Sequence, residues 1–141
     1  MLILVSSGCK NSSANLFSLL PPEKTGILFN NIIEETDTFN ILYSEYLYNG
    51  GGVGIGDFNN DGLNDLYFAG NKVPNALYLN RGNFNFENIS ERAGIGAEDI
   101  WSLGVSVVDI NQDGWMDIYV TASFEFEEGN RKNKLFIKEN H

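Results

Sequence analysis

The stretch that decides the fold is DFNNDGLND, residues 57–65, and it has a near-copy in DINQDGWMD, residues 109–117. Both stretches carry Asp at positions 1, 5 and 9, Asn at position 3 and Gly at position 6. An acidic turn that is merely solvated has no physical reason to repeat this spacing. The pattern therefore leaves two alternatives, a pair of polar hairpin turns without metal or two copies of one cation-binding loop.

The two loops belong to an internal repeat that extends beyond them. Residues 51–70 align with 103–122 at an offset of 52, and eight of the twenty aligned positions are identical. A second block, NALYLN at 75–80, matches NKLFIK at 133–138 at an offset of 58. The second copy therefore carries a six-residue insertion, which falls in its acidic stretch SFEFEEGNRKN. Such a repeat predicts two structural units of the same design.

Each copy predicts a set of short strands. One run rich in β-branched and aromatic residues enters the Asp loop, a second leaves it and a third follows a polar turn. The runs are 53–58, 65–69 and 76–79 in the first copy, and 105–110, 117–121 and 134–137 in the second. The first copy adds a fourth run at 84–89, followed by SERAGI, which predicts one helical turn.

Three or four antiparallel strands in ~50 residues are typical of one blade of a β-propeller. We therefore expect an all-β chain that forms a partial β-propeller of about two antiparallel blades with Ca-binding loops. The blade units are expected at residues 50–90 and 102–141, the second being truncated. Because propellers have typically 4–8 blades, we expect this chain to be a piece of a longer protein.

The spacing of oxygen-bearing residues in each loop suits a hard divalent cation, which needs several oxygen ligands at once. Side chains at positions 1, 3, 5 and 9 can supply oxygens, the backbone carbonyl at position 7 can supply another, and glycine at position 6 permits a sharp turn. The candidate ligands are Asp57, Asn59, Asp61, the Leu63 carbonyl and Asp65 in the first loop, and Asp109, Asn111, Asp113, the Trp115 carbonyl and Asp117 in the second.

Calcium is the ion that this donor set favours. Three carboxylates within nine residues repel one another, and a bound cation removes that cost. A flexible loop that mixes carboxylates with a carbonyl suits Ca²⁺ better than Mg²⁺, which demands a tight octahedron and keeps its waters. Zinc is not favoured, because the only histidine is His141 and the only cysteine is Cys9. We expect two structural Ca²⁺ sites.

An EF-hand is the nearest rival, because its loop opens in the same way. That motif requires Glu at position 12 and a helix on each side of the loop. Position 12 is Phe68 in the first copy and Val120 in the second, and both lie within runs that predict strands. The sequence therefore argues against an EF-hand.

The charge balance narrows the possible partners. The chain has nine Lys and Arg against nineteen Asp and Glu, a net charge of −10. Binding to nucleic acid or to an anionic membrane surface requires clustered basic residues, so we expect neither. An acidic excess is what a cation-binding protein would show.

The N-terminal sequence MLILVSSGCK resembles the end of a bacterial lipoprotein signal peptide, in which the cysteine becomes the lipidated first residue. On this interpretation residues 1–9 are a partial signal with Cys9 as lipidation site, and 10–25 are a linker to the repeat region at 26–141. The protein would be exported, as a periplasmic protein or a lipoprotein of the outer membrane or cell surface attached to a membrane only through the lipid on Cys9. The alternative is an apolar terminus with a chance cysteine.

The run GVGIGDFNNDGLNDLYFAGN resembles the FG-GAP or VCBS repeat, the blade unit of integrin-α-like β-propellers. The following NALYLNRGNFNFENISERAGI and DINQDGWMDIYV are similar to bacterial FG-GAP proteins that often carry an ASPIC/UnbV domain. The resemblance covers about residues 26–141. It implies that the Asp loops bind Ca²⁺ between the first two strands of a blade and that the propeller serves adhesion or ligand binding.

Three functions remain open on sequence alone. The favoured one is a non-catalytic module that binds a protein or glycan ligand. An enzyme fragment, such as a hydrolase or lyase with its catalytic residues outside this chain, is the alternative, and a scaffold without a ligand is the third. The chain has no Ser/His/Asp set, and NGGGVGIGD lacks the Lys and Ser or Thr of a phosphate loop. Trp101 and Trp115 could stack on sugars or pack between blades.

Overall fold

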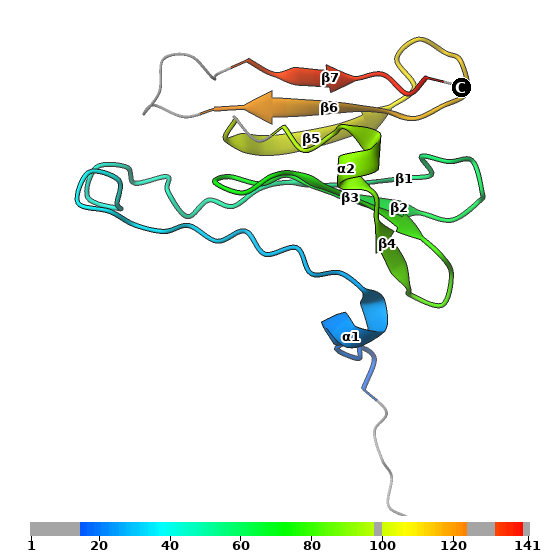
Figure 1. The fold of residues 1–141 in the computed structure, drawn as a ribbon, viewed down its shortest axis with the longest axis horizontal. Coiled ribbons are helices and arrows are strands. Elements are labelled where there is room, and N and C mark those ends of the chain that lie inside the picture. Colours follow the sequence, from blue (N-terminus) through cyan, green and yellow to red (C-terminus); the bar gives the residue numbers. More distant parts are fainter. Residues whose placement is uncertain (1–14, 98–99, 124–131, 140–141) are drawn as a thin grey trace, which may run out of the picture.

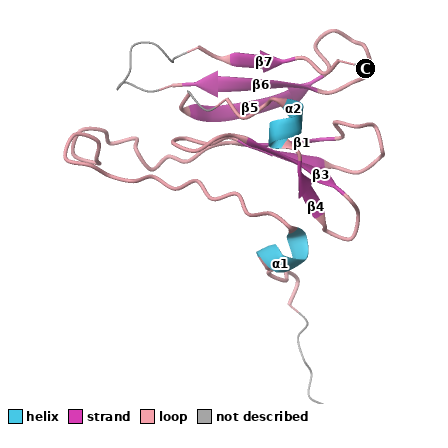
Figure 2. Ribbon diagram, viewed as in Figure 1, coloured by secondary structure: helices cyan, strands magenta, loops and turns pink. Residues whose placement is uncertain are grey.

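The structure is a computed structural model that describes residues 15–97, 100–123 and 132–139. Its elements are mostly short strands (Figure 2). They are α1 (Pro22–Thr25), β1 (Val53–Gly56), β2 (Asp65–Phe68), β3 (Ala76–Asn80), β4 (Phe86–Asn88), α2 (Ser90–Ala93), β5 (Ser102–Val108), β6 (Asp117–Ala122) and β7 (Lys134–Phe136). The predicted all-β class is confirmed, each predicted strand has an observed counterpart, and the helical turn expected in SERAGI is α2.

The strands form two antiparallel sheets, and each sheet corresponds to one copy of the repeat. The first sheet has the order β1-β2-β3-β4 and the second the order β5-β6-β7, so chain neighbours are also neighbours in the sheet. Equivalent residues occupy equivalent places: Ile55 pairs with Leu66 in the first sheet, and Val107 pairs with Ile118 in the second. Each copy of the repeat therefore forms one sheet, while the blade units at residues 50–90 and 102–141 of a propeller stay a prediction. The predicted insertion falls largely on residues 124–131, outside the described residues.

The two sheets stack face to face as two layers (Figure 1). Their facing side chains form one core, to which the first sheet contributes Tyr67 and Leu77 and the second contributes Ile118 and Val120. Both Tyr67 and Val120 have no solvent-exposed surface. Because a strand points alternate residues to opposite faces, the alternation along β2 and β6 selects which residues meet in this shared core.

The innermost strands β1 and β5 approach each other closely. The Gly52 backbone N–H donates to the Leu103 carbonyl at 2.5 Å, which joins the two sheets directly. A Cβ atom added at Gly54 would lie 2.6 Å from a Val105 methyl carbon. Small residues in β1 therefore permit the contact, as the glycine-rich sequence before the first Asp loop indicates.

Gly52→Ala tests this close approach. The added Cβ would lie 2.6 Å from the Leu103 carbonyl oxygen, so the two backbones would have to separate. We expect a loss of about 1–3 kcal/mol in the free energy of unfolding, the usual cost of overpacking, measured by urea denaturation. Ser106→Ala, at an exposed position of β5, is the control, with an expected change within about 0.5 kcal/mol. Equal stability of the two variants would contradict the packing described here.

Residues N-terminal to the sheets cover part of the outer face of the first sheet. The Phe29 ring stacks on Phe68 with centroids 5.0 Å apart, and the Leu28 N–H donates to the Tyr78 hydroxyl at 3.3 Å. Beyond them, residues 36–49 form a lobe that projects past the ends of the sheets (Figure 1). Between residues 26 and 48 the structure has no strand, only an isolated bridge between Thr36 and Phe39.

Candidate metal centre

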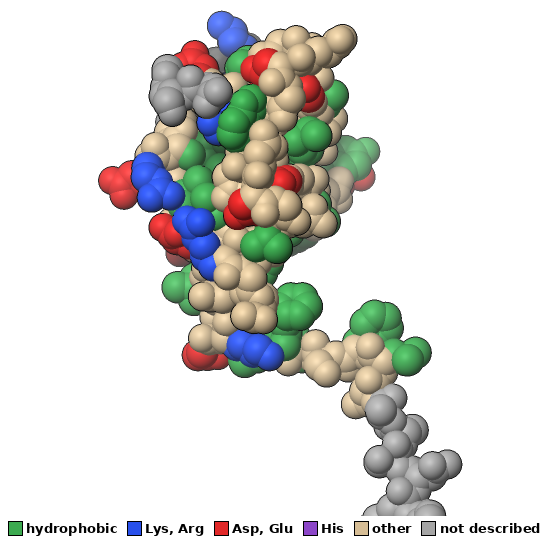
Figure 3. Space-filling view, turned by 90° about the vertical axis from the view of Figure 1, so that its right-hand side faces the viewer, with side chains coloured by type: hydrophobic (Ala, Val, Ile, Leu, Met, Phe, Trp, Pro, Cys, Tyr) green, Lys and Arg blue, Asp and Glu red, His purple; other side chains and the backbone are tan. Residues whose placement is uncertain are grey.

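The two Asp loops connect the first two strands of each sheet, β1 to β2 and β5 to β6, and lie at the same end of the molecule (Figure 1). They touch each other, because the Asn60 side-chain amide donates to the Gly114 carbonyl at 3.2 Å. Figure 3 faces this end and shows acidic side chains on its surface. The repeat therefore places both candidate sites side by side rather than on opposite faces.

The first loop is organised by its own side-chain oxygens. One carboxylate oxygen of Asp57 accepts the Asp61 N–H at 3.1 Å, and the other accepts the Gly62 N–H at 2.8 Å. Asn59 Oδ1 also accepts the Asp61 N–H at 3.2 Å, and Asp61 Oδ1 accepts the Leu63 N–H at 2.9 Å. Gly62 has φ +85°, which explains the glycine at position 6. Positions 1, 3 and 5 thus converge on one tight turn.

The second loop repeats these contacts. Asp109 accepts the N–H groups of Asp113 and Gly114 at 3.1 and 2.8 Å, and Asn111 Oδ1 accepts the Asp113 N–H at 3.1 Å. Asp113 Oδ1 accepts the Trp115 N–H at 2.9 Å, and Gly114 has φ +88°. Because the skipped positions differ between the copies, the shared Asp, Asn and Gly residues determine this geometry.

The aspartate at position 9 has a different environment from the others. Asp65 is fully buried, and its two oxygens accept the N–H groups of Phe58 and Asn80, each at 2.8 Å. Burial raises the pKa of the Asp65 carboxyl. The two N–H donors oppose that shift, and the nearby carboxylates of Asp61 and Asp57 add to it. Asp65 therefore ties the start of the loop to the end of β3.

Asp117 makes the equivalent contacts in the second sheet. It is fully buried, and it accepts the Ile110 N–H at 3.1 Å and the Lys138 N–H at 2.8 Å. Sequence reasoning treated both position-9 aspartates only as ligands and missed this bracing role. A signal was present: Asn80 and Lys138 are equivalent positions, the last residues of the repeated blocks NALYLN and NKLFIK.

The donor set fits calcium by its chemistry. Each loop offers three carboxylates, one amide oxygen and one backbone carbonyl, all hard oxygen donors. A carboxylate has about four acceptor sites, so the N–H bonds to positions 1 and 9 leave capacity for an ion. Within the described ranges, no three His, Cys, Asp or Glu side chains are already gathered into a metal cluster. The negatively charged carboxylates of a loop repel one another, which is a physical reason why they are not gathered together. Ligation by the ten candidate residues stays a prediction.

The two tryptophans differ in their surroundings. Trp101 is buried, and its ring contacts the Phe39 ring edge-on at 5.9 Å between centroids. This agrees with the packing alternative for Trp101. Trp115 is half-buried beside the second Asp loop, and the Lys138 ammonium lies 4.6 Å from its ring centroid. The Lys138 ammonium therefore covers one face of the Trp115 ring, and sugar stacking by Trp115 stays a prediction.

Residues 57–120, which contain both Asp loops and strands β2 to β5, match the sequence model of the FG-GAP-like repeat. This match confirms the FG-GAP part of the resemblance over these residues, and the similarity to proteins with an ASPIC/UnbV domain stays a prediction.

Particular relatives carry the name cartilage acidic protein 1. The protein from Xenopus tropicalis is 29% identical over 96 residues, which cover 66% of this chain and 14% of the relative. The Homo sapiens protein is 33% identical over 72 residues, which cover 50% of this chain and 11% of the relative. The chain thus matches only a small part of these proteins. No solved structure matches the chain significantly.

Proposed function

We propose that the chain is a calcium-stabilised, non-catalytic repeat module of an exported protein, and that it binds a protein or glycan ligand. The single observation that carries the calcium part is the pair of Asp loops with the same hydrogen bonds at the same positions. Two copies of one acidic turn, folded alike despite different intervening residues, are better explained by a shared ion than by solvation alone.

The ion would be structural in this proposal. Bound Ca²⁺ supplies positive charge that offsets the repulsion among the three aspartates of a loop. The side-chain oxygens of Asp57, Asn59 and Asp61 fix the turn by accepting backbone N–H groups of the loop. Asp65 holds the loop to β3. Occupation of the loop would therefore stabilise the connection between the first two strands of each sheet.

The export part rests on the N-terminal sequence. Cys9 lies outside the described residues, so its lipidation and the signal at residues 1–9 stay predictions, as does the linker from residue 10. Among the helices that the structure describes, neither is long and apolar enough to cross a membrane. The pairing with an ASPIC/UnbV domain and a bacterial source likewise stay predictions.

Thermal unfolding tests the calcium proposal. We expect added Ca²⁺ to raise the melting temperature relative to chelator, because an ion that binds only the folded state stabilises it by about 2.7 kcal/mol at a hundred times its Kd. Asp61→Ala and Asp113→Ala should each reduce this shift by about half. Asp37→Ala, an exposed acid far from both loops in sequence, is the matched control and should retain it. A folded protein without any shift would overturn the proposal.

A further inference from the structure

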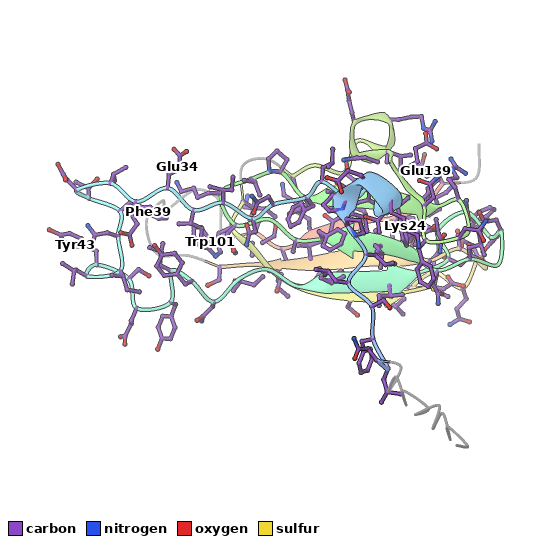
Figure 4. The ribbon with its side chains drawn as sticks, turned by 90° about the horizontal axis from the view of Figure 1, so that it is seen from below. Lys24, Glu34, Phe39, Tyr43, Trp101 and Glu139 are labelled. Carbon is purple, nitrogen blue, oxygen red and sulfur yellow. The ribbon has the colours of Figure 1, made fainter. Side chains whose placement is uncertain are left out.

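The lobe formed by residues 36–49 carries a surface that neither sheet uses. In Figure 4, Tyr43 lies at its outer end, while Phe39 and Trp101 lie nearer the sheets. Its large side chains are unusually open to solvent: Leu42 is 91% exposed, Tyr43 66% and Tyr46 64%. A cluster of exposed large apolar residues on one projection marks an interaction site more often than chance.

The lobe is a preformed platform rather than a loose loop. Thr36 and Phe39 exchange backbone hydrogen bonds at 2.8 and 3.2 Å, and the Asn40 side chain donates to the Thr36 carbonyl at 3.0 Å. Leu47 is completely buried, and Phe39 contacts Trp101 at the base. A partner would therefore meet a lobe whose backbone is already held in place, which lowers the entropy cost of binding.

The charge on this surface has one sign. Glu34, Glu35, Asp37 and Glu45 are all exposed on or beside the lobe, and no Lys or Arg occurs between residues 26 and 71. The exception in space is Lys72, whose ammonium lies 4.7 Å from the centroid of the Phe39 ring at the base of the lobe. The Phe39 ring at the base of the lobe thus already makes a cation–π contact. The exposed tyrosines of the lobe would offer the same kind of contact to a partner.

We propose that the lobe docks a basic, partly apolar segment of another protein, with Tyr43 and Tyr46 as the aromatic anchors and the surrounding carboxylates as charge partners. This names the surface and partner chemistry of the binding role proposed above, and it rests on that role. A second copy of the chain is disfavoured because each copy carries a net charge of −10. An anionic lipid surface is disfavoured for the same reason.

The test is fluorescence anisotropy of the full chain with a labelled peptide of alternating arginine and leucine, in calcium buffer. Tyr43→Ser/Tyr46→Ser should weaken binding about tenfold or more, as loss of aromatic anchors does at interface hot spots. Phe84→Ser is the matched control, because Phe84 is 64% exposed on the turn before β4 and its replacement also leaves the net charge unchanged. The control should bind like the wild type, and a peptide with glutamate in place of arginine should not bind.

If Tyr43→Ser/Tyr46→Ser and Phe84→Ser bind the peptide equally well, the proposal is overturned, because the attraction would then come from nonspecific electrostatics. Self-association that is lost in Tyr43→Ser/Tyr46→Ser, seen by sedimentation, would overturn it in favour of a second copy. Binding to vesicles of anionic lipid through the same tyrosines would overturn the proposal in favour of a membrane surface as the partner. Calcium titration of the same variants separates the two proposals: normal calcium binding without peptide binding removes the docking surface and leaves the calcium module standing.

Discussion

Replacement of Asp65 by Ala is expected to destabilise the fold by about 2–4 kcal/mol, because a buried backbone donor that loses its acceptor costs about 1–3 kcal/mol. Two such donors, the N–H groups of Phe58 and Asn80, depend on the Asp65 carboxylate. The variant also removes a buried charge whose desolvation is unfavourable, and this recovers part of the loss. The expected destabilisation therefore lies below twice the upper limit for a single donor. Urea denaturation in the presence of chelator measures the effect without any contribution from bound calcium.

Asp57→Ala is the matched control for this variant. Asp57 also accepts two backbone N–H groups, but its hydrogen bonds are exposed to solvent, so water can replace the lost acceptor. We expect a loss of less than about 1 kcal/mol for Asp57→Ala in chelator. The bracing role of Asp65 would be refuted if both variants lost the same stability.

Tyr67→Ala is expected to cost about 3–5 kcal/mol, the usual range for removal of a large aromatic side chain from a core. Tyr67 has no exposed surface and lies in the cluster where the two sheets meet. The hydroxyl donates to the Ile95 carbonyl at 3.4 Å, and burial raises the pKa of Tyr67 well above its usual value. Because this residue serves both sheets, its loss should lower the stability of the whole stack in a single unfolding transition.

Tyr46→Ala provides the comparison, since Tyr46 is exposed on the lobe and makes no contribution to the shared core. We expect its stability to stay within about 0.5 kcal/mol of the wild type by urea denaturation. Separate transitions for the two sheets in Tyr67→Ala, or a loss no larger than that of Tyr46→Ala, would show that the sheets do not share one core.

The strands and both loops were predictable because their signals are local and occur twice. Val, Ile, Tyr and Phe in short runs indicate strands, and the offset of 52 residues places Asp57 and Asp109 at the same position of two units. Their glycines at position 6 predicted the positive φ that the structure shows. The repetition indicated a repeated structural unit, which a single acidic turn could not indicate.

Other features depend on which surfaces meet in three dimensions, and local patterns do not encode that. Phe58 lies within the first Asp loop and is nevertheless buried in the core, while its counterpart Ile110 is half exposed. The Asn60 contact with Gly114 requires the loops to be neighbours, which follows only from the stacking of the sheets. Apolar residues in the lobe at 36–49 follow no regular period that would predict its structure, because side-chain and turn hydrogen bonds shape it.

The most direct test of the central claim is the calcium stoichiometry of the purified chain, measured by isothermal titration calorimetry after chelator treatment. The account predicts about two ions per chain for the wild type, one for each Asp loop. Asp61→Ala and Asp113→Ala should each leave one ion, and the double variant should bind none while still folded by circular dichroism. A wild-type protein that binds no calcium, or a double variant that still binds two ions, would contradict it.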